Sequence, residues 1–179
     1  ILMKWITSFS HLDTKTYEHQ VVCMDFEEAL DVFLPFVDMV YADPPYTRDH
    51  YSRFYHVLET IAKGDYPLPD NPDSLAAYRS DRHQSPFCIK SKAPAAFDRL
   101  FKAASDAKKP LVVSYSSFDA DKGHRPRVLS LQDLTSSAQT YFATVDVKVV
   151  ERLSHNKFNS SNLNSEAGTR EALITCIPW

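Results

Sequence analysis

Glycine is scarce in this sequence, with only Gly64, Gly123 and Gly168 among 179 residues. Average usage of about 7% predicts about twelve in a chain of this length. The scarcity excludes glycine-rich turns, such as GxGxxG or a P-loop, which bring backbone N–H groups close to the phosphates of a nucleotide. A nucleotide-like cofactor must therefore be bound without such a turn, or with one that another polypeptide supplies.

The sequence also lacks a long apolar run and a secretory signal. Pro35 and Asp38 interrupt the richest apolar stretch, so no segment approaches the roughly 18 apolar residues of a membrane span. Residues Ile1 to Phe9 have neither a full hydrophobic region nor a small-residue cleavage site. We therefore expect a soluble protein without a membrane partner.

The three cysteines, Cys23, Cys88 and Cys176, are odd in number and far apart. They form neither a disulfide framework nor the spacing of a zinc site, so we predict no metal centre and a reducing, cytoplasmic setting. Cys23 and Cys176 lie in apolar segments and are expected to be buried. The net charge of −3 excludes a uniformly basic protein that coats nucleic acid, while a local basic face remains compatible with it.

The apolar pattern alternates between strands and helices, which predicts an α/β fold in one domain, residues 1–179. The expected strands are Gln20 to Met24, Phe36 to Ala42, Leu111 to Tyr115, Val145 to Arg152 and Arg170 to Ile177. The stretch from Phe36 is nearly all apolar, which suits a central parallel strand buried on both faces. The last two strands predict a terminal antiparallel hairpin on an otherwise parallel sheet.

The expected helices are Phe26 to Leu34, Asp49 to Ala62 with Gly64 as its C-cap, and Pro94 to Ala107. In the second helix, the aromatic residues at positions 51, 54 and 55 have the spacing of core residues. Residues 65–92 contain four prolines and are expected to form a long loop or insertion.

The strongest chemical signal is the tetrapeptide Asp43-Pro44-Pro45-Tyr46, which directly follows the strand expected to end at Ala42. In open α/β sheets, ligands bind outside the carboxyl ends of the strands, where this acid and this ring are expected. A specified four-residue string arises by chance in such a chain with a probability on the order of 10⁻³. The same residues could simply form a turn that ends the strand, with Tyr46 as a packing residue.

With this tetrapeptide at a strand end, the sequence resembles the amino-group DNA methyltransferases, specifically the DNA adenine methylase family, whose signature is DPPY. The resemblance continues through residues 47–56, the strand at 111–117 and the closing hairpin, and it covers nearly the whole chain. It implies a partial Rossmann-like methyltransferase sheet, mostly parallel, with a C-terminal antiparallel hairpin. It also implies a site-specific adenine methyltransferase that uses S-adenosylmethionine to methylate the N6 amine of adenine in DNA.

The resemblance assigns catalytic roles to Asp43, Pro44, Pro45 and Tyr46. The exocyclic amine of adenine is a poor nucleophile, because its lone pair is delocalised into the ring. The carboxylate of Asp43 and the carbonyl of Pro44 would each accept one N–H and turn that lone pair towards the methyl donor. The ring of Tyr46 would stack on a base extruded from the duplex. The same geometry polarises the N4 amine of cytosine, which is a lesser alternative.

Further residues are assigned to the cofactor and to DNA. Asp25 and Phe26 resemble the family's contact with the adenine of the cofactor, the acid accepting from the amine and the ring packing on the base. Cations and polar side chains on two loops are candidate phosphate contacts; they are Arg79, Arg82, Lys90, Lys92, His155, Asn156 and Lys157. Each of these, taken singly, also fits a solvated surface side chain.

The chain departs from the family at its N-terminal side. The FxGxG turn for the methionine part of S-adenosylmethionine is missing, as is the acid that follows it, and the target-recognition region is missing or reduced. Three explanations are open: a C-terminal piece of a longer methylase, one subunit of a split enzyme, or a degenerate relative. The first two predict a second polypeptide or N-terminal segment that carries the glycine-rich motif and covers an open sheet edge. The third predicts an inactive DNA-binding or regulatory module.

Overall fold

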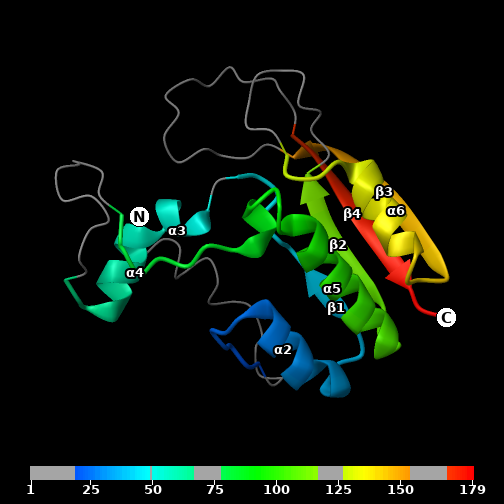
Figure 1. The fold of residues 1–179 in the computed structure, drawn as a ribbon, viewed down its shortest axis with the longest axis horizontal. Helices are drawn as coiled ribbons and strands as arrows, with labels where there is room; N and C mark the ends of the chain where they lie inside the picture. The colour runs from blue at the N-terminus through cyan, green and yellow to red at the C-terminus, as the bar shows by residue number, and fades with distance from the viewer. Residues whose placement is uncertain (1–18, 49, 67–77, 117–126, 154–168) are drawn as a thin grey trace, which may run out of the picture.

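The computed structural model of the chain describes residues 19–48, 50–66, 78–116, 127–153 and 169–179. They form an α/β fold around a four-stranded mixed sheet of order β1-β2-β4-β3 (Figure 1). The strands are β1 (Val40–Ala42), β2 (Leu111–Ser116), β3 (Thr144–Leu153) and β4 (Thr169–Ile177). The α/β class is therefore confirmed.

The sheet has one parallel pairing, β1 with β2, and two antiparallel ones. In the terminal hairpin, Val145 lies opposite Cys176 and Val147 opposite Ile174, so that apolar residues of both strands share a face. The predicted hairpin is confirmed. The expected predominance of parallel pairing is not found among the described strands, because β4 inserts antiparallel between β2 and β3.

Some of the helices pack on one face of this sheet (Figure 1). The α-helices are α2 (Phe26–Phe33), α3 (Tyr51–Phe54), α4 (His56–Lys63), α5 (Ala93–Asp106) and α6 (Leu131–Gln139); short 3-10 turns span Leu34–Phe36 and Pro86–Cys88. Within the described ranges, no helix is both long and apolar enough to cross a membrane.

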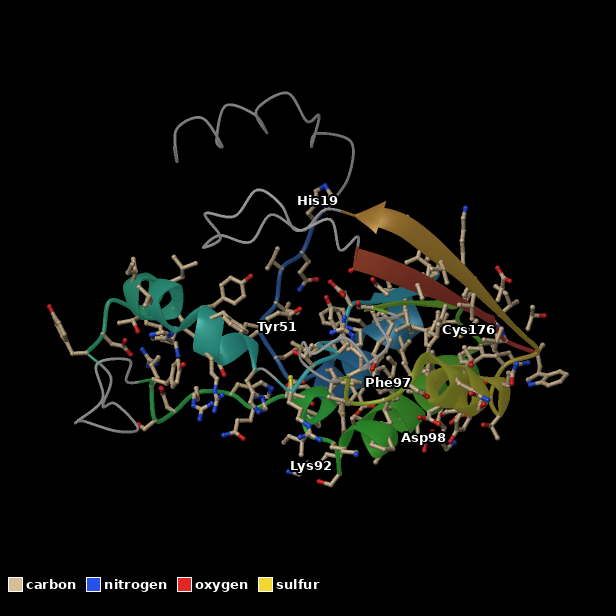
Figure 2. All side chains as sticks on the ribbon, turned by 90° about the horizontal axis from the view of Figure 1, so that it is seen from above. His19, Tyr51, Lys92, Phe97, Asp98 and Cys176 are labelled. Atoms are coloured by element: carbon tan, nitrogen blue, oxygen red, sulfur yellow. The ribbon has the colours of Figure 1, made fainter. Side chains whose placement is uncertain are left out.

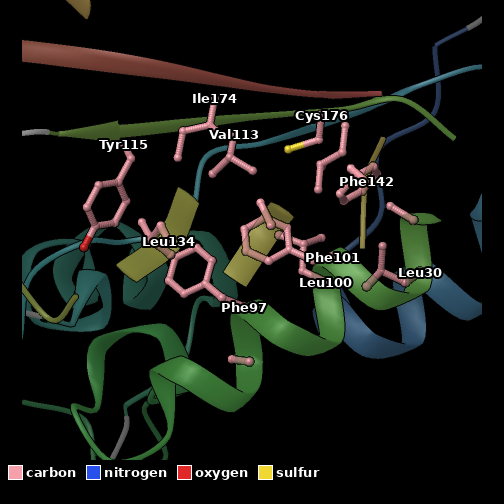
Figure 3. Close-up of a cluster of buried hydrophobic side chains, with 14 of the residues drawn as sticks. Leu30, Phe97, Leu100, Phe101, Val113, Tyr115, Leu134, Phe142, Ile174 and Cys176 are labelled. Carbon is pink, nitrogen blue, oxygen red and sulfur yellow. The ribbon is translucent and has the colours of Figure 1, made fainter. Parts of the chain in front are cut away.

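Helix α5 shows how the sequence positions the core. Pro94 lies in the first turn, where its missing N–H leaves no hydrogen bond unmade. Its buried residues recur at helical spacing and form one stripe; they are Ala93, Ala96, Phe97, Leu100, Phe101 and Ala104. Figure 3 shows Phe97 and Phe101 of this stripe facing Val113 of β2 and Ile174 of β4. This contact ties α5 to the centre of the sheet.

Two strand predictions are corrected. Gln20 to Met24 is irregular and exposed, and Cys23 is exposed with it, because no described strand lies beside this segment to share a hydrogen-bonded ladder. Cys176 is buried, as expected. The strand predicted from Phe36 is reduced to β1, which is an edge strand and only half-buried. Phe36 itself belongs to a 3-10 turn and is exposed.

The helix predicted after the tetrapeptide is divided at Tyr55 into α3 and α4, and Gly64 ends it in the left-handed conformation, with φ of 62°. Its apolar residues do not pack in the core as expected. Tyr51, Phe54 and Tyr55 are each about half exposed, and Leu58 and Ile61 more so. The two helices extend away from the sheet in Figure 1, which explains this exposure.

Helix α6 was missed by the apolar pattern. It begins at a capping box, in which Ser130 Oγ accepts from the Asp133 N–H at 3.0 Å while the Asp133 carboxylate accepts from the Ser130 N–H. The Ser-x-x-Asp spacing before Leu134 and Ala138 is the sequence signal that could have identified it. Both apolar residues are fully buried.

Candidate active site

A cavity of about 590 Å³ lies at the carboxyl end of β1. Five separate parts of the chain form its walls: the start of α2, strand β1 with residues 43–45, helices α3 and α4, residues 83–87, and Leu100 of α5. Its volume falls within the range of roughly 300–1,000 Å³ that is typical of small-molecule sites. The cavity therefore joins segments that are up to about seventy-five residues apart in the sequence.

Asp43, Pro44 and Pro45 all line this cavity. Strand β1 pairs parallel with β2 through Ala42 and Val113, and the prolines then end the ladder because they have no N–H to donate. Pro44 is buried, whereas the side chain of Asp43 is exposed. The site predicted at the end of this strand is thus placed where a carboxylate can reach a ligand.

Tyr46 lies beside the cavity without lining it. Its ring meets the ring of Tyr115 edge-on, with centroids 5.8 Å apart, and the guanidinium carbon of Arg127 lies 4.5 Å from its centroid. Burial raises the pKa of the Tyr46 hydroxyl, an effect that Arg127 partly opposes. Tyr46 therefore packs against Tyr115 and Arg127, as the alternative reading of the tetrapeptide expected. Because Arg127 covers one face of the ring, at most the other face is left for a ligand.

Asp25 and Phe26 reach the same cavity from the start of α2. Asp25 is the N-cap of this helix, and one of its carboxylate oxygens accepts from the Glu27 N–H at 2.9 Å. The other oxygen keeps its acceptor capacity for a ligand. The half-buried ring of Phe26 packs against Phe87, with centroids 4.8 Å apart. An acid and an aromatic ring are thus adjacent, as the contact with an adenine requires.

Several residues of the cavity were missed as site residues. His50, Tyr51 and Tyr55 line it from the helices that follow the tetrapeptide, together with Glu59, His83 and Ser85. Figure 2 shows Tyr51 between these helices and the body of the protein. Burial, with smaller contributions from Tyr46 and Asp43, raises the pKa of Tyr51 to about 12, so its hydroxyl stays neutral at physiological pH. The position of its helix directly after the strand-end motif was the available signal.

Arg79 is held in an ion-pair network. Only 5% exposed, it pairs with Asp65 at 2.6 Å and Asp81 at 2.8 Å, and it also donates to Thr60. Its five N–H groups are all used in these contacts. This network joins the end of α4 to residues 79–81 and leaves Arg79 no donor for the phosphate contact predicted from the sequence.

The other predicted phosphate contacts differ in their surroundings. Arg82 stacks on Tyr78, which Arg53 also approaches, with the guanidinium carbons 5.6 and 5.5 Å from the ring centroid. Lys90 and Lys92 are exposed near the start of α5, where Figure 2 shows Lys92 at the edge of the molecule. Residues 155–157, with the predicted contacts His155, Asn156 and Lys157, lie outside the described residues.

The arrangement suits a flat heterocycle that carries an amine. The carboxylates of Asp25 and Asp43 offer acceptors at two places in one cavity, and Phe26 and Tyr51 provide aromatic walls. Among the described residues, no cluster of histidine, cysteine and carboxylate side chains could hold a metal ion.

Comparison with known proteins identifies a family. The family model for D12 class N6 adenine-specific DNA methyltransferases matches residues 6–118, which include α2, the tetrapeptide, α5 and β2. No solved structure matches the chain.

Three curated proteins are similar to the chain. Modification methylase LlaI of Lactococcus lactis subsp. lactis is 32% identical over 70% of this chain and 18% of its own length. Type II methyltransferase M.FokI of Planomicrobium okeanokoites is 39% identical over 45% of this chain and 12% of its own length. Modification methylase StsI of Streptococcus sanguinis is 23% identical over 76% of this chain and 19% of its own length. The chain thus spans less than a fifth of each relative.

Proposed function

Because the chain belongs to the D12 class N6 adenine-specific DNA methyltransferase family, we propose that it is the catalytic part of an enzyme that methylates the N6 amine of adenine in DNA. S-adenosylmethionine supplies the methyl group. The observation that carries the proposal is the single cavity shared by Asp25, Phe26, Asp43 and Pro44. Two relatives are named modification methylases, which supports a role in DNA modification of the kind that accompanies restriction.

In this proposal, Asp43 and the carbonyl of Pro44 accept the two N–H groups of the target amine. The bonds orient the nitrogen and draw its lone pair out of conjugation. After transfer the methylated nitrogen carries a positive charge, and it releases one proton to the carboxylate of Asp43, which already accepts one of its N–H groups. The face of the Tyr46 ring opposite Arg127 stacks on the extruded base. Asp25 and Phe26 hold the adenine of the cofactor.

The enzyme is proposed to need a second segment or subunit that carries a glycine-rich turn. Within the described residues, β1 is an edge strand, and the apolar side chains of Met39 and Tyr41 along it are more than half exposed. Val21 is almost fully exposed in the irregular segment nearby. Strands from this second segment would pair with the edge of β1 and extend the sheet towards a Rossmann-like one, and the rest of the segment would cover the exposed apolar side chains. Lys90, Lys92, Arg82 and residues 155–157 remain proposed contacts with DNA phosphates.

The proposed reaction is tested by methyl transfer to amplified DNA, whose adenine and cytosine amines are unmethylated. The substrate is incubated with labelled S-adenosylmethionine and the chain, alone and together with the proposed glycine-rich segment. We expect N6-methyladenine in the hydrolysed product when both polypeptides are present. N4-methylcytosine would change the assigned base. Neither product, together with no binding of S-adenosylmethionine, would identify the inactive DNA-binding module instead.

Replacing Phe26 with alanine is expected to weaken S-adenosylmethionine binding. Loss of one ring–base stack of about 1–3 kcal/mol corresponds to an increase in Kd of roughly 5- to 150-fold. Calorimetry on the two-polypeptide enzyme measures this change. Phe33→Ala is the matched control, because Phe33 is half-buried on the same helix and lines a different pocket. Equal Kd values for the two variants would contradict the cofactor role of Phe26.

A further inference from the structure

We propose that Arg127 is the positioning residue that holds the ring of Tyr46 in the orientation in which it stacks on the target base. The inference rests on the proposed function. It concerns a residue more than eighty positions away from the tetrapeptide, in a polar part of the sequence that has no recognisable motif. The contacts of residues 127–129 with Tyr46 and with the end of β2 carry it.

The backbone brings the two segments together. Thr47 and Arg127 form an isolated antiparallel bridge, and the Val128 N–H donates to the Tyr46 carbonyl at 3.1 Å. The backbone at Tyr46 and Thr47 is therefore held by residues 127 and 128. A backbone fixed in this way limits where the ring can point, although the ring still has rotamers to choose between.

The side chain of Arg127 limits that choice. Its guanidinium lies over the Tyr46 ring, while Nε donates to the Ser116 carbonyl at 3.2 Å and Nη2 to the Ser116 hydroxyl at 2.5 Å. Ser116 ends β2 and is 1% exposed, so the guanidinium is anchored to a buried residue at the end of this strand. A planar fork with two directed bonds fixes its own orientation, and thereby that of the ring stacked on it.

Tyr115 holds the edge of the same ring. It is buried, meets Tyr46 edge-on, and its hydroxyl donates to the Leu129 carbonyl at 2.7 Å and accepts from the Leu129 N–H at 3.3 Å. Figure 3 shows Tyr115 projecting from β2 at the margin of the core. Tyr46 is thus fixed at its backbone, at one edge and on one face, so that a base stacks on the face opposite Arg127.

A purely structural contact would not need a cation. Burial lowers the pKa of Arg127, which means that its charge is held at a cost, and an aliphatic side chain could cover the ring without this desolvation. What an aliphatic side chain lacks is the pair of bonds to Ser116. A role in positioning Tyr46 accounts for both observations: the guanidinium lies over the tyrosine ring, and its two bonds to Ser116 fix its own orientation.

The test compares Arg127→Met, which keeps the length and loses charge and donors, with Arg127→Lys and the control Arg99→Met. Arg99 is exposed on α5 and pairs with Glu27 at the surface. In the two-polypeptide enzyme we expect Arg127→Met to lower kcat by about 10- to 100-fold, as small misplacements of reacting groups do. The KM for S-adenosylmethionine should not change. Arg127→Lys should recover part of the loss, and Arg99→Met should match the wild type.

A second readout does not depend on activity. In spectra of the chain with ¹³C-labelled tyrosine rings, Arg127→Met should shift the Tyr46 resonances and make its ring flips faster, while the resonances of Tyr55 keep their positions. Wild-type kcat in Arg127→Met, or unchanged Tyr46 resonances, overturns the inference. If Arg127→Met does not fold, the folded Arg127→Lys variant decides, and wild-type kcat there also overturns it. Absence of methylation by the wild type would instead reject the proposed function and leave the spectra to test the ring contact.

Discussion

An enzyme in which Asp43 is replaced with alanine is expected to lose methyl transfer by about 10³-fold in kcat, with little change in the Kd for S-adenosylmethionine. Of the two acceptors assigned to the target amine, the carboxylate is the one that a side-chain substitution can remove. Loss of a hydrogen-bond partner that acts at the reacting atom typically costs about 10²- to 10³-fold in kcat. The measurement is steady-state incorporation of labelled methyl groups into amplified DNA.

This prediction separates catalysis from folding. The Asp43 side chain is exposed, so its removal should leave the unfolding temperature nearly unchanged. Asp38→Ala is the matched control, because Asp38 is an exposed acid shortly before β1 and does not line the cavity. Full methylation by the Asp43→Ala enzyme would refute the assigned mechanism. Loss of activity by both variants would show that the effect is not specific to the site.

Replacing Phe97 with alanine should lower the free energy of unfolding by about 3–5 kcal/mol, the range for truncation of a buried phenylalanine. Phe97 is 1% exposed and contacts the rings of Phe87, Phe101 and Tyr115. The cavity left by the ring would remove these contacts together with the transfer free energy of the side chain. Urea denaturation, followed by circular dichroism, measures the change.

Phe36→Ala provides the comparison for Phe97. Phe36 is 84% exposed, so its replacement should change the free energy of unfolding by no more than about 0.5 kcal/mol. Similar destabilisation by the two substitutions would contradict the placement of the core between α5 and the sheet. The Phe97 variant should also bind S-adenosylmethionine more weakly, because Phe87 connects Phe97 with the cavity-lining ring of Phe26.

Helix α5 and the terminal hairpin could be predicted from the sequence because their signals are local. In α5 the apolar residues repeat at the helical period over fourteen residues. In β3 of the hairpin, the alternation of Val145 and Val147 with polar residues selects which side chains face the core. The tetrapeptide was recognisable for the same reason, since four consecutive residues carry the motif and the preceding apolar residues place it at a strand end.

The helix after the tetrapeptide shows where a local signal misleads. Periodicity correctly predicted helical structure there, but not that Leu58 and Ile61 would be exposed. An amphipathic pattern states that one face is apolar, and it does not name what covers that face. The strand predicted from Phe36 to Ala42 was too long for a related reason. A strand extends only as far as a neighbour pairs with it, and β2 pairs with residues 40–42 alone.

The sequence by itself determined the α/β class, the core face of α5, the hairpin, and the acid and prolines that end β1. Tertiary structure alone decided that Asp25 and Asp43 share a cavity, that Arg79 forms ion pairs with two aspartates, and that Arg127 lies over the ring of Tyr46. The physical reason is the distance along the sequence over which each kind of interaction acts. Propensity and periodicity act over a few residues, whereas these contacts form between segments that only strand order and helix packing bring together, and the partner of a charged side chain is chosen by that proximity.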